Sequence, residues 1–215
     1  MTTDSRIDAT RSALLADGVI VAIRCDDAAT AERAARAALA GGLRVLEITL
    51  TTPGALELIA RLAGEGVALV GAGTVLGPAD VTAVAAAGAR YALSPVFGAD
   101  VADAARAAGL LYVPGAATPL EMLTAHRAGC ALVKFFPSGA LGGPAFLRAV
   151  RGPLPEIGLI PTSGPDSTNI GDFVAAGARA VGVGPELFGP GWTPESVTAA
   201  ARRTREAMDA ARAAR

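Results

Sequence analysis

The sequence has 215 residues, of which 52% are hydrophobic and 18% charged, and its formal net charge is −1. This length and composition predict a single domain, residues 1–215, with a large hydrophobic core. The near-zero charge excludes an electrostatic footprint for nucleic acid or an anionic membrane surface, and no apolar run is long enough to span a bilayer. The first 17 residues lack a signal-peptide core, so we expect a cytoplasmic protein.

Short runs rich in Val, Leu and Ile recur along the chain, and each ends in glycine or polar residues. They predict eight strands that begin near residues 19, 44, 67, 90, 110, 130, 157 and 179. Their apolar character is typical of parallel strands that are covered on both faces. Between them lie Ala-rich amphipathic stretches such as Thr30–Leu39, and glycines such as Gly109 and Gly129 stand where a helix end needs a left-handed residue.

This alternation predicts an α/β protein built as a (β/α)₈ TIM barrel. An extra helix is expected before the first strand, at Arg6–Ala16, and another at the end of the chain, at Pro194–Ala214. A doubly wound open sheet is the alternative. It is less favoured because no Gly-rich dinucleotide loop follows the first strand, where the sequence reads Arg24–Asp27.

The basic residues are eighteen arginines and one lysine, Lys134. A bias that replaces lysine by arginine wherever a positive charge suffices leaves a lysine only where arginine cannot serve. A buried lysine can lose its proton and act as a nucleophilic amine, which arginine cannot do. The alternative is the chance survival of one ordinary lysine.

Polar residues stand at the carboxyl ends of nearly all the predicted strands, where a barrel gathers its functional groups. Glu47 and Thr49 share one face of the second strand, and Lys134 and Phe136 share one face of the sixth. If these faces point inward, a carboxylate and an amine lie in one apolar cavity. One interpretation is a buried ion pair that holds the barrel together, although such pairs are weak evidence for stability. The other is an amine nucleophile beside an acid that transfers protons, which we favour.

Six short segments, in this order and spacing, closely resemble the 2-keto-3-deoxy-6-phosphogluconate aldolase / 4-hydroxy-2-oxoglutarate aldolase family. The resemblance runs from about Val19 to Phe188. The segments are Leu46–Leu50, Val70–Val75, Ser94-Pro95, Val113–Gly115, Val133–Pro137 and Pro161-Thr162.

The resemblance implies a homotrimeric class I aldolase that needs no metal or other cofactor and binds a small 2-keto acid such as pyruvate. It implies that Lys134 forms the Schiff base and that Glu47 is the general acid/base. The same resemblance implies further substrate-binding residues, namely Arg24, Thr51, Thr74, Pro95, Phe136, Thr162, Ser163, Gly164 and Gly184.

Two departures from the family pattern bear on the substrate. Some members carry an arginine where this chain has Thr51, and others carry one at the end of the first strand, so Arg24 is expected to face the substrate carboxylate. Phosphate-binding members have Thr-Gly-Gly and Gly-Ser where this chain has Thr162–Gly164 and Gly184-Pro185. Pro185 lacks a hydroxyl and a backbone N–H, so the substrate is expected to be non-phosphorylated, or phosphorylated and held more weakly.

Two other functions would use the same strand ends. A barrel isomerase or epimerase acting on a sugar phosphate would form no covalent adduct at Lys134 and would need an intact phosphate loop. A non-catalytic sugar-acid binding protein would have little reason to keep both Lys134 and Glu47. The single histidine, His126, and two separate cysteines, Cys25 and Cys130, predict no metal site.

Overall fold

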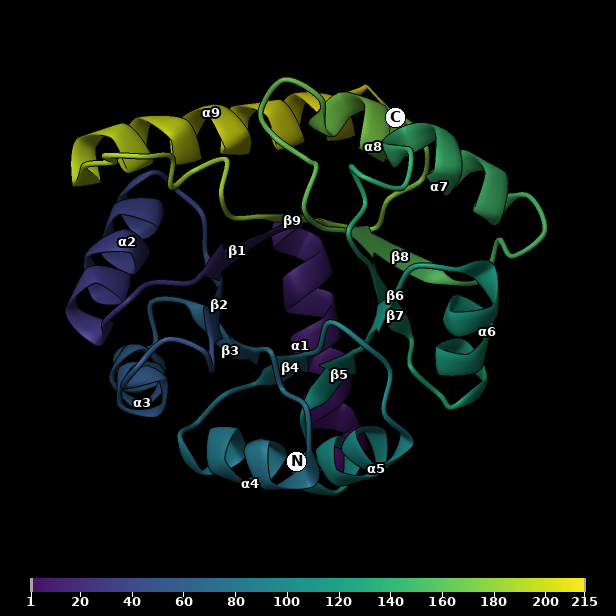
Figure 1. Ribbon diagram of the computed structural model, residues 1–215, viewed down its shortest axis with the longest axis horizontal. Coiled ribbons are helices and arrows are strands. Elements are labelled where there is room, and N and C mark those ends of the chain that lie inside the picture. Colours follow the sequence, from purple (N-terminus) through teal and green to yellow (C-terminus); the bar gives the residue numbers. More distant parts are fainter. Residues whose placement is uncertain (1, 215) are drawn as a thin grey trace.

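Parallel strands lie around the centre of the protein, with helices outside them (Figure 1). The computed structural model describes residues 2–214, so Met1 and Arg215, the ends of the predicted domain, lie outside the described residues. The strands are β1 (Val19–Ile23), β2 (Val45–Thr49), β3 (Leu69–Gly73), β4 (Tyr91–Leu93), β5 (Leu111–Val113), β6 (Gly115–Ala116), β7 (Leu132–Phe135), β8 (Gly158–Pro161) and β9 (Val181–Val183). The helices are α1 (Thr3–Asp17), α2 (Ala28–Ala40), α3 (Ala55–Glu65), α4 (Pro78–Ala86), α5 (Ala99–Ala108), α6 (Pro119–Arg127), α7 (Gly143–Arg151), α8 (Ile170–Ala175) and α9 (Pro194–Ala213).

The strands pair in two parallel sheets, in the orders β5-β4-β3-β2-β1-β9 and β6-β7-β8. The predicted fifth strand is divided into β5 and β6 because Pro114 between them has no N–H to donate to a neighbour. The carbonyl oxygen of Pro114 still accepts a hydrogen bond of 2.8 Å from the N–H of Lys134. At the other junction, Thr162 and Gly182 form an isolated parallel bridge. The α/β class with parallel strands is therefore as predicted. The hydrogen-bonded strands form two sheets, whereas one closed eight-stranded barrel was predicted.

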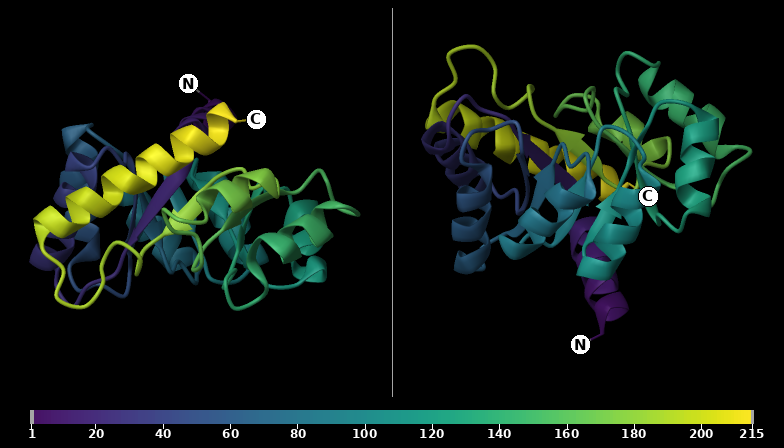
Figure 2. Two further views of the ribbon diagram at one scale, coloured as in Figure 1. Left: turned by 90° about the horizontal axis from the view of Figure 1, so that it is seen from above. Right: turned by 60° about the horizontal axis from the view of Figure 1, so that its bottom comes forward.

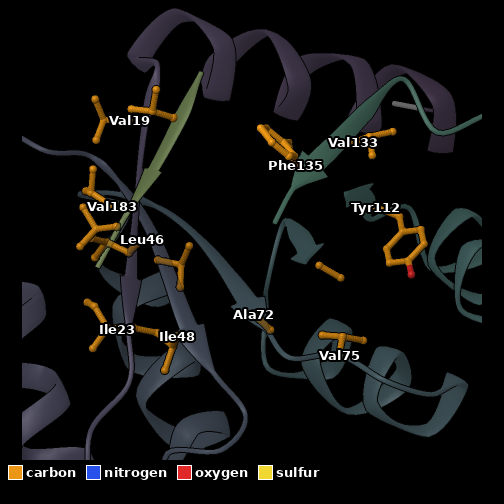
Figure 3. Packing of buried hydrophobic residues seen from close by; sticks show 14 of the residues in the cluster. Val19, Ile23, Leu46, Ile48, Ala72, Val75, Tyr112, Val133, Phe135 and Val183 are labelled. Atoms are coloured by element: carbon orange, nitrogen blue, oxygen red, sulfur yellow. The ribbon is translucent and has the colours of Figure 1, made fainter. Parts of the chain in front are cut away.

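The outward faces of the strands pack against the helices. Val19 and Ile23 of β1 and Leu46 and Ile48 of β2 are fully buried in this layer (Figure 3). Both faces of the strands are buried, as the Val/Ile/Leu-rich runs predict. Each such side chain contributes about 1.5–3 kcal/mol by leaving water.

The inward faces form a second cluster near the amino-terminal ends of the strands. Its members are Leu14, Ile20, Val45, Tyr91, Leu93, Leu111, Val113, Leu132, Ile160 and Ala180. Leu14 comes from α1, which lies behind the strands in Figure 1 and projects from them in Figure 2. The side chain of Arg205 on α9 donates to the carbonyl of Asp17 at 2.7 Å and anchors the end of α1. Apolar packing and α1 thus fill one end of the interior, which leaves the other end for polar groups.

The left-handed residues predicted at Gly109 and Gly129 are confirmed. Gly109 closes α5 in the left-handed conformation, at φ 70°. Thr118 and Glu121 form a capping box at the start of α6, and each side chain accepts the N–H of the other residue. The third strand begins later than predicted, at Leu69 instead of residue 67, and Val67 is 46% exposed. In residues 2–214, no helix combines the length and apolarity needed to cross a membrane.

Candidate active site

A pocket of about 350 Å³ lies at the carboxyl ends of the strands. Its walls come from β1, β2, β7 and β9 and from the segments that follow β1, β7, β8 and β9. The lining residues are Ala22, Arg24, Glu47, Thr49, Lys134, Phe136, Thr162, Ser163, Val183, Gly184, Pro185 and Phe188. Seven of the eleven predicted site residues are thus brought together here, namely Arg24, Glu47, Lys134, Phe136, Thr162, Ser163 and Gly184.

Lys134 and Glu47 meet in the interior of the pocket. Lys134 Nζ lies 3.6 Å from Glu47 Oε1, and the two residues are 7% and 2% exposed. The other carboxylate oxygen, Oε2, has no hydrogen-bond partner among the described residues. A buried ion pair stabilises a fold only when its remaining polar atoms are also satisfied. This pair does not meet that condition, which favours a chemical role over a structural one.

The positions of both charges follow from strand alternation. Glu47 is the third residue of β2 and Lys134 the third of β7, and each points to the inward face. Lys134 Nζ also lies 5.3 Å from the centroid of the Phe136 ring, which follows it by two residues. An amine in this setting has one apolar wall and one acidic neighbour.

Tyr91 of β4 is fully buried among the inward-facing residues of the strands. Its ring packs so closely on Gly71 that a Cβ there would come within 2.4 Å of it. Burial, and then the charge of Glu47, raises the pKa of the Tyr91 phenol well above its usual value. The phenol therefore stays neutral and adds no charge below the Lys134–Glu47 pair.

Arg24 stands at the rim of the pocket, directly after β1. Its guanidinium donates to the hydroxyl of Thr51 and, at 3.3 Å, to the hydroxyl of Thr74. Thr74 has a φ of 61°, a conformation rare for a β-branched residue. Thr51 and Thr74 are not lining residues, and both contact the guanidinium of Arg24, which is one. Two hydroxyls thus fix the orientation of one positive charge at the rim.

Thr162 and Ser163 form the wall that follows β8. The N–H of Thr162 bonds to the Phe135 carbonyl at 3.0 Å, and its hydroxyl lies close to Gly182. A Cβ at Gly182 would come within 2.4 Å of Thr162 Oγ1, so β9 needs a glycine there. Ser163 has a φ of 60°, a strained conformation for a serine, and its side chain lines the pocket.

Two predicted site residues lie elsewhere. Pro95 lines an adjacent cavity of about 380 Å³, with Phe136 at the boundary between the two. The backbone carbonyl of Pro95 packs against Gly115. A Cβ added to Gly115 would come within 2.1 Å of that carbonyl oxygen, so the contact requires a glycine. Gly164 has a φ of 152° and packs against Gly139, where it supports the loop without lining the pocket.

Several lining residues were not predicted. Ala22 precedes Arg24 by two residues on β1, and strand alternation could have identified it. Val183 ends β9 and precedes the predicted Gly184. Phe188 comes from the turn beyond β9, and no sequence pattern indicates its position. Across residues 2–214, no three His, Cys, Asp or Glu side chains gather in a group that could hold a metal ion.

Residues 11–199 match the family model described as KDPG and KHG aldolase. The chain belongs to this aldolase family. It is 39% identical over 142 residues to 2-dehydro-3-deoxy-phosphogluconate aldolase of Pseudoalteromonas atlantica, a match that spans 66% of each chain and therefore just under two thirds of that relative.

Two solved structures are similar to this chain in fold. One is KDPG aldolase from Legionella pneumophila with pyruvate captured at low pH as a covalent carbinolamine intermediate. It is 30% identical, with a TM-score of 0.77 over 98% of both chains. Another is a cube-shaped, highly porous cage designed by fusing symmetric oligomeric domains. It is 29% identical, with a TM-score of 0.85 over 92% of this chain and 74% of that chain.

Proposed function

We propose that this protein is a class I aldolase, a carbon–carbon lyase that cleaves a 4-hydroxy-2-keto acid reversibly to pyruvate and an aldehyde through a Schiff base on Lys134. One observation carries the proposal. The only lysine of an aldolase-family chain is buried in a pocket, 3.6 Å from a buried glutamate with one unpartnered oxygen among the described residues. An amine and an acid so placed can act as nucleophile and proton carrier.

The first stage joins the substrate to the enzyme. The Lys134 ammonium of the resting ion pair first passes a proton to Glu47. The neutral Nζ then attacks the C2 carbonyl carbon, and one proton moves from the nitrogen to the oxygen to give a carbinolamine. Glu47 then donates a proton to the C2 hydroxyl, which leaves as water, and a C=N⁺ iminium forms. The contact between Nζ and Oε1 puts Glu47 within reach of the atoms that exchange these protons.

The second stage breaks the carbon–carbon bond. The Glu47 carboxylate accepts the proton of the C4 hydroxyl, the C3–C4 electron pair moves into the iminium, and the aldehyde leaves. The remaining enamine takes a proton at C3 from Glu47, and water then hydrolyses the iminium to release pyruvate and the free amine. The unpartnered Oε2 supports this role because it is available to both substrate protons.

Substrate orientation comes from the rim. Arg24 faces the substrate carboxylate in this proposal, and Thr51 and Thr74 hold the guanidinium in place. Phe136 packs beside the reacting carbons, and Thr162, Ser163 and Gly184 border the more distant part of the substrate. Pro95 and Gly164 act only through the segments they support.

Three broader proposals accompany the activity. Residues 1–215 form a single domain in which β5, Pro114 and β6 act as one strand, so that eight strands close a (β/α)₈ barrel. The Lys134–Pro114 hydrogen bond and the Thr162–Gly182 bridge support closure. The protein is a homotrimer, which similarity to a cage of fused symmetric oligomeric domains supports. A cytoplasmic location, with neither nucleic acid nor membrane as a partner, stays a prediction from the sequence.

Pyruvate release tests the proposed activity. Purified protein is incubated with 2-keto-3-deoxygluconate, its 6-phosphate and 4-hydroxy-2-oxoglutarate, and pyruvate is followed by NADH oxidation with lactate dehydrogenase. We expect release from at least one substrate, unchanged by EDTA and abolished in Lys134→Ala. An EDTA-sensitive activity, or undiminished activity in Lys134→Ala, would contradict the Schiff-base mechanism. Light scattering of the same sample tests the trimer.

A further inference from the structure

The turn that follows β9 uses its own hydrogen-bond donors internally. The N–H of Gly184 donates to Glu186 Oε2 at 2.8 Å. The carbonyl of Gly184 accepts the N–H groups of Leu187, at 2.8 Å, and Phe188, at 3.3 Å. Three backbone donors at this wall are therefore engaged within the turn, and one of them is held by a carboxylate.

Pro185 further reduces the number of backbone N–H donors available at this wall. It lines the pocket together with Gly184 and Phe188, and it has no N–H. Sites for phosphate use converging backbone N–H groups and positive charge. At this wall a phosphate would meet a proline ring, an aromatic ring and an N–H already bonded to Glu186. The carboxylate would also repel its two negative charges.

The positive charges that line the pocket are a second, independent argument against a bound phosphate. Among the described lining residues, the positive charges are those of Arg24 and Lys134, and Lys134 is paired with Glu47. If Arg24 binds the carboxylate of the 2-keto acid, the remainder of the lining offers no cation for a second anionic group. The neighbouring wall, which follows β8, supplies the hydroxyls of Thr162 and Ser163, which suit the hydroxyl groups of a substrate.

We propose that Glu186, with Pro185, excludes a phosphate at the far end of the substrate, so that the aldehyde released is an uncharged hydroxyaldehyde. This inference rests on the proposed aldolase function. It assigns Glu186 as a specificity-determining residue that acts by occupying the Gly184 N–H and by its charge. It also separates this chain from the similar P. atlantica enzyme, whose name specifies a phosphorylated substrate.

The test compares two substrates that differ only in the phosphate. We would measure kcat/KM for 2-keto-3-deoxygluconate and for its 6-phosphate in wild type, Glu186→Ala and Glu186→Gln. Wild type should prefer the unphosphorylated acid by at least about tenfold, which is ~1.4 kcal/mol. Glu186→Ala removes both the charge and the occupant of the N–H, so the ratio should move toward the phosphate by about tenfold. Glu186→Gln removes only the charge and should move it less.

Glu156→Ala is the matched control. Glu156 is an exposed carboxylate that precedes β8, at the opposite ends of the strands from the pocket. Its removal should leave the ratio at the wild-type value. A wild-type preference for the 6-phosphate would overturn the inference, and an unchanged ratio in both Glu186 variants would overturn the role of Glu186. The ratio of the two kcat/KM values in wild type tests the exclusion of phosphate even if a variant does not fold.

Failure of the proposed function has a different signature. If pyruvate forms no reducible adduct with Lys134, the aldolase proposal fails. If the adduct forms and wild type prefers the phosphorylated acid, only the specificity inference fails.

Discussion

Gly73 lies against Glu47 so closely that a methyl group in place of its hydrogen would come within 2.0 Å of Glu47 Oε1. The two residues are on neighbouring strands, where Gly73 pairs with Thr49 and Gly71 pairs with Glu47. The carboxylate that meets Lys134 therefore occupies space that exists only because β3 ends in a glycine. This contact connects a backbone position to the geometry of the proposed acid/base.

Gly73→Ala should impair catalysis without removing a catalytic group. The new Cβ would displace the Glu47 carboxylate and change its position relative to Lys134. Because a positioned acid/base contributes about 10²–10⁴-fold, we expect kcat to fall at least tenfold. Overpacking should also cost about 1–3 kcal/mol of unfolding free energy. Steady-state kinetics and urea denaturation measure the two effects.

Gly64→Ala is the control for this variant. Gly64 lies on the exposed side of α3, and a Cβ there meets no atom within 4 Å. Helix propensity should raise the unfolding free energy by about 0.5–1 kcal/mol and leave kcat unchanged. If folded Gly73→Ala had the same kcat as Gly64→Ala, the position of Glu47 would not matter for the reaction.

The buried ion pair can be tested for stability separately from activity. Lys134→Met leaves Glu47 buried without its partner, so we expect a loss of about 3–5 kcal/mol in urea denaturation at pH 8. The double variant Lys134→Met/Glu47→Leu removes both charges and should recover most of that loss while staying inactive. A double variant less stable than Lys134→Met would mean that the pair is needed for folding.

Both cysteine thiols should be unreactive in the folded protein. Burial raises the pKa of the Cys130 thiol from its ordinary value of 9.0 to about 11, which leaves about a hundredfold less thiolate at pH 8. Burial, followed by the charges of Asp27 and Asp26, also raises the pKa of Cys25. Iodoacetamide labelling, read by peptide mass spectrometry, should be slow at Cys130 and become fast in guanidinium. Equal rates at Cys130 in folded and unfolded protein would refute this.

The capping box of α6 predicts a pH-dependent stability. The N–H groups of Ala117 and Thr118 donate to Glu121 and lower the pKa of its carboxyl below 4.5. A lowered folded-state pKa gives stability that is present above the unfolded value and is lost as pH falls through the folded value. Glu121→Gln should therefore be less stable than wild type at pH 7, by under ~1 kcal/mol because solvent screens the group, and the difference should shrink near pH 3. A difference that is equal at both pH values would contradict this origin.

Strand alternation predicted the central contact of the site. The two-residue period placed Glu47 and Lys134 on inward faces, and their burial and 3.6 Å separation agree with it. The physical reason is that a one-residue error in a strand's register would put a charge among the apolar contacts of the outer layer. Buried charges are thus strongly constrained by local sequence.

Positions that depend on packing between loops could not be predicted in this way. Phe188 reaches the pocket through the turn held by Gly184, and Pro95 is diverted to a neighbouring cavity by its contact with Gly115. The third strand was placed too early because the apolar run at Val67 was counted, whereas Gly71 and Gly73, which pair with β2, gave no strand signal. The sequence pattern also did not show that β5 and β6 are separate strands on either side of Pro114. The Pro114 carbonyl between them still accepts a hydrogen bond from the N–H of Lys134.

Borohydride trapping shows whether Lys134 forms a Schiff base with a 2-keto acid. The protein is incubated with pyruvate and treated with borohydride, and its intact mass is then measured by mass spectrometry. The Lys134→Ala variant is treated in the same way. Because Lys134 is the only lysine, the only other primary amine is the N-terminus. We expect one reduced pyruvate adduct on wild type, located at Lys134 by peptide mapping, and none on the variant. Folded wild-type protein that gains no mass, or an adduct that persists in Lys134→Ala, would contradict this expectation.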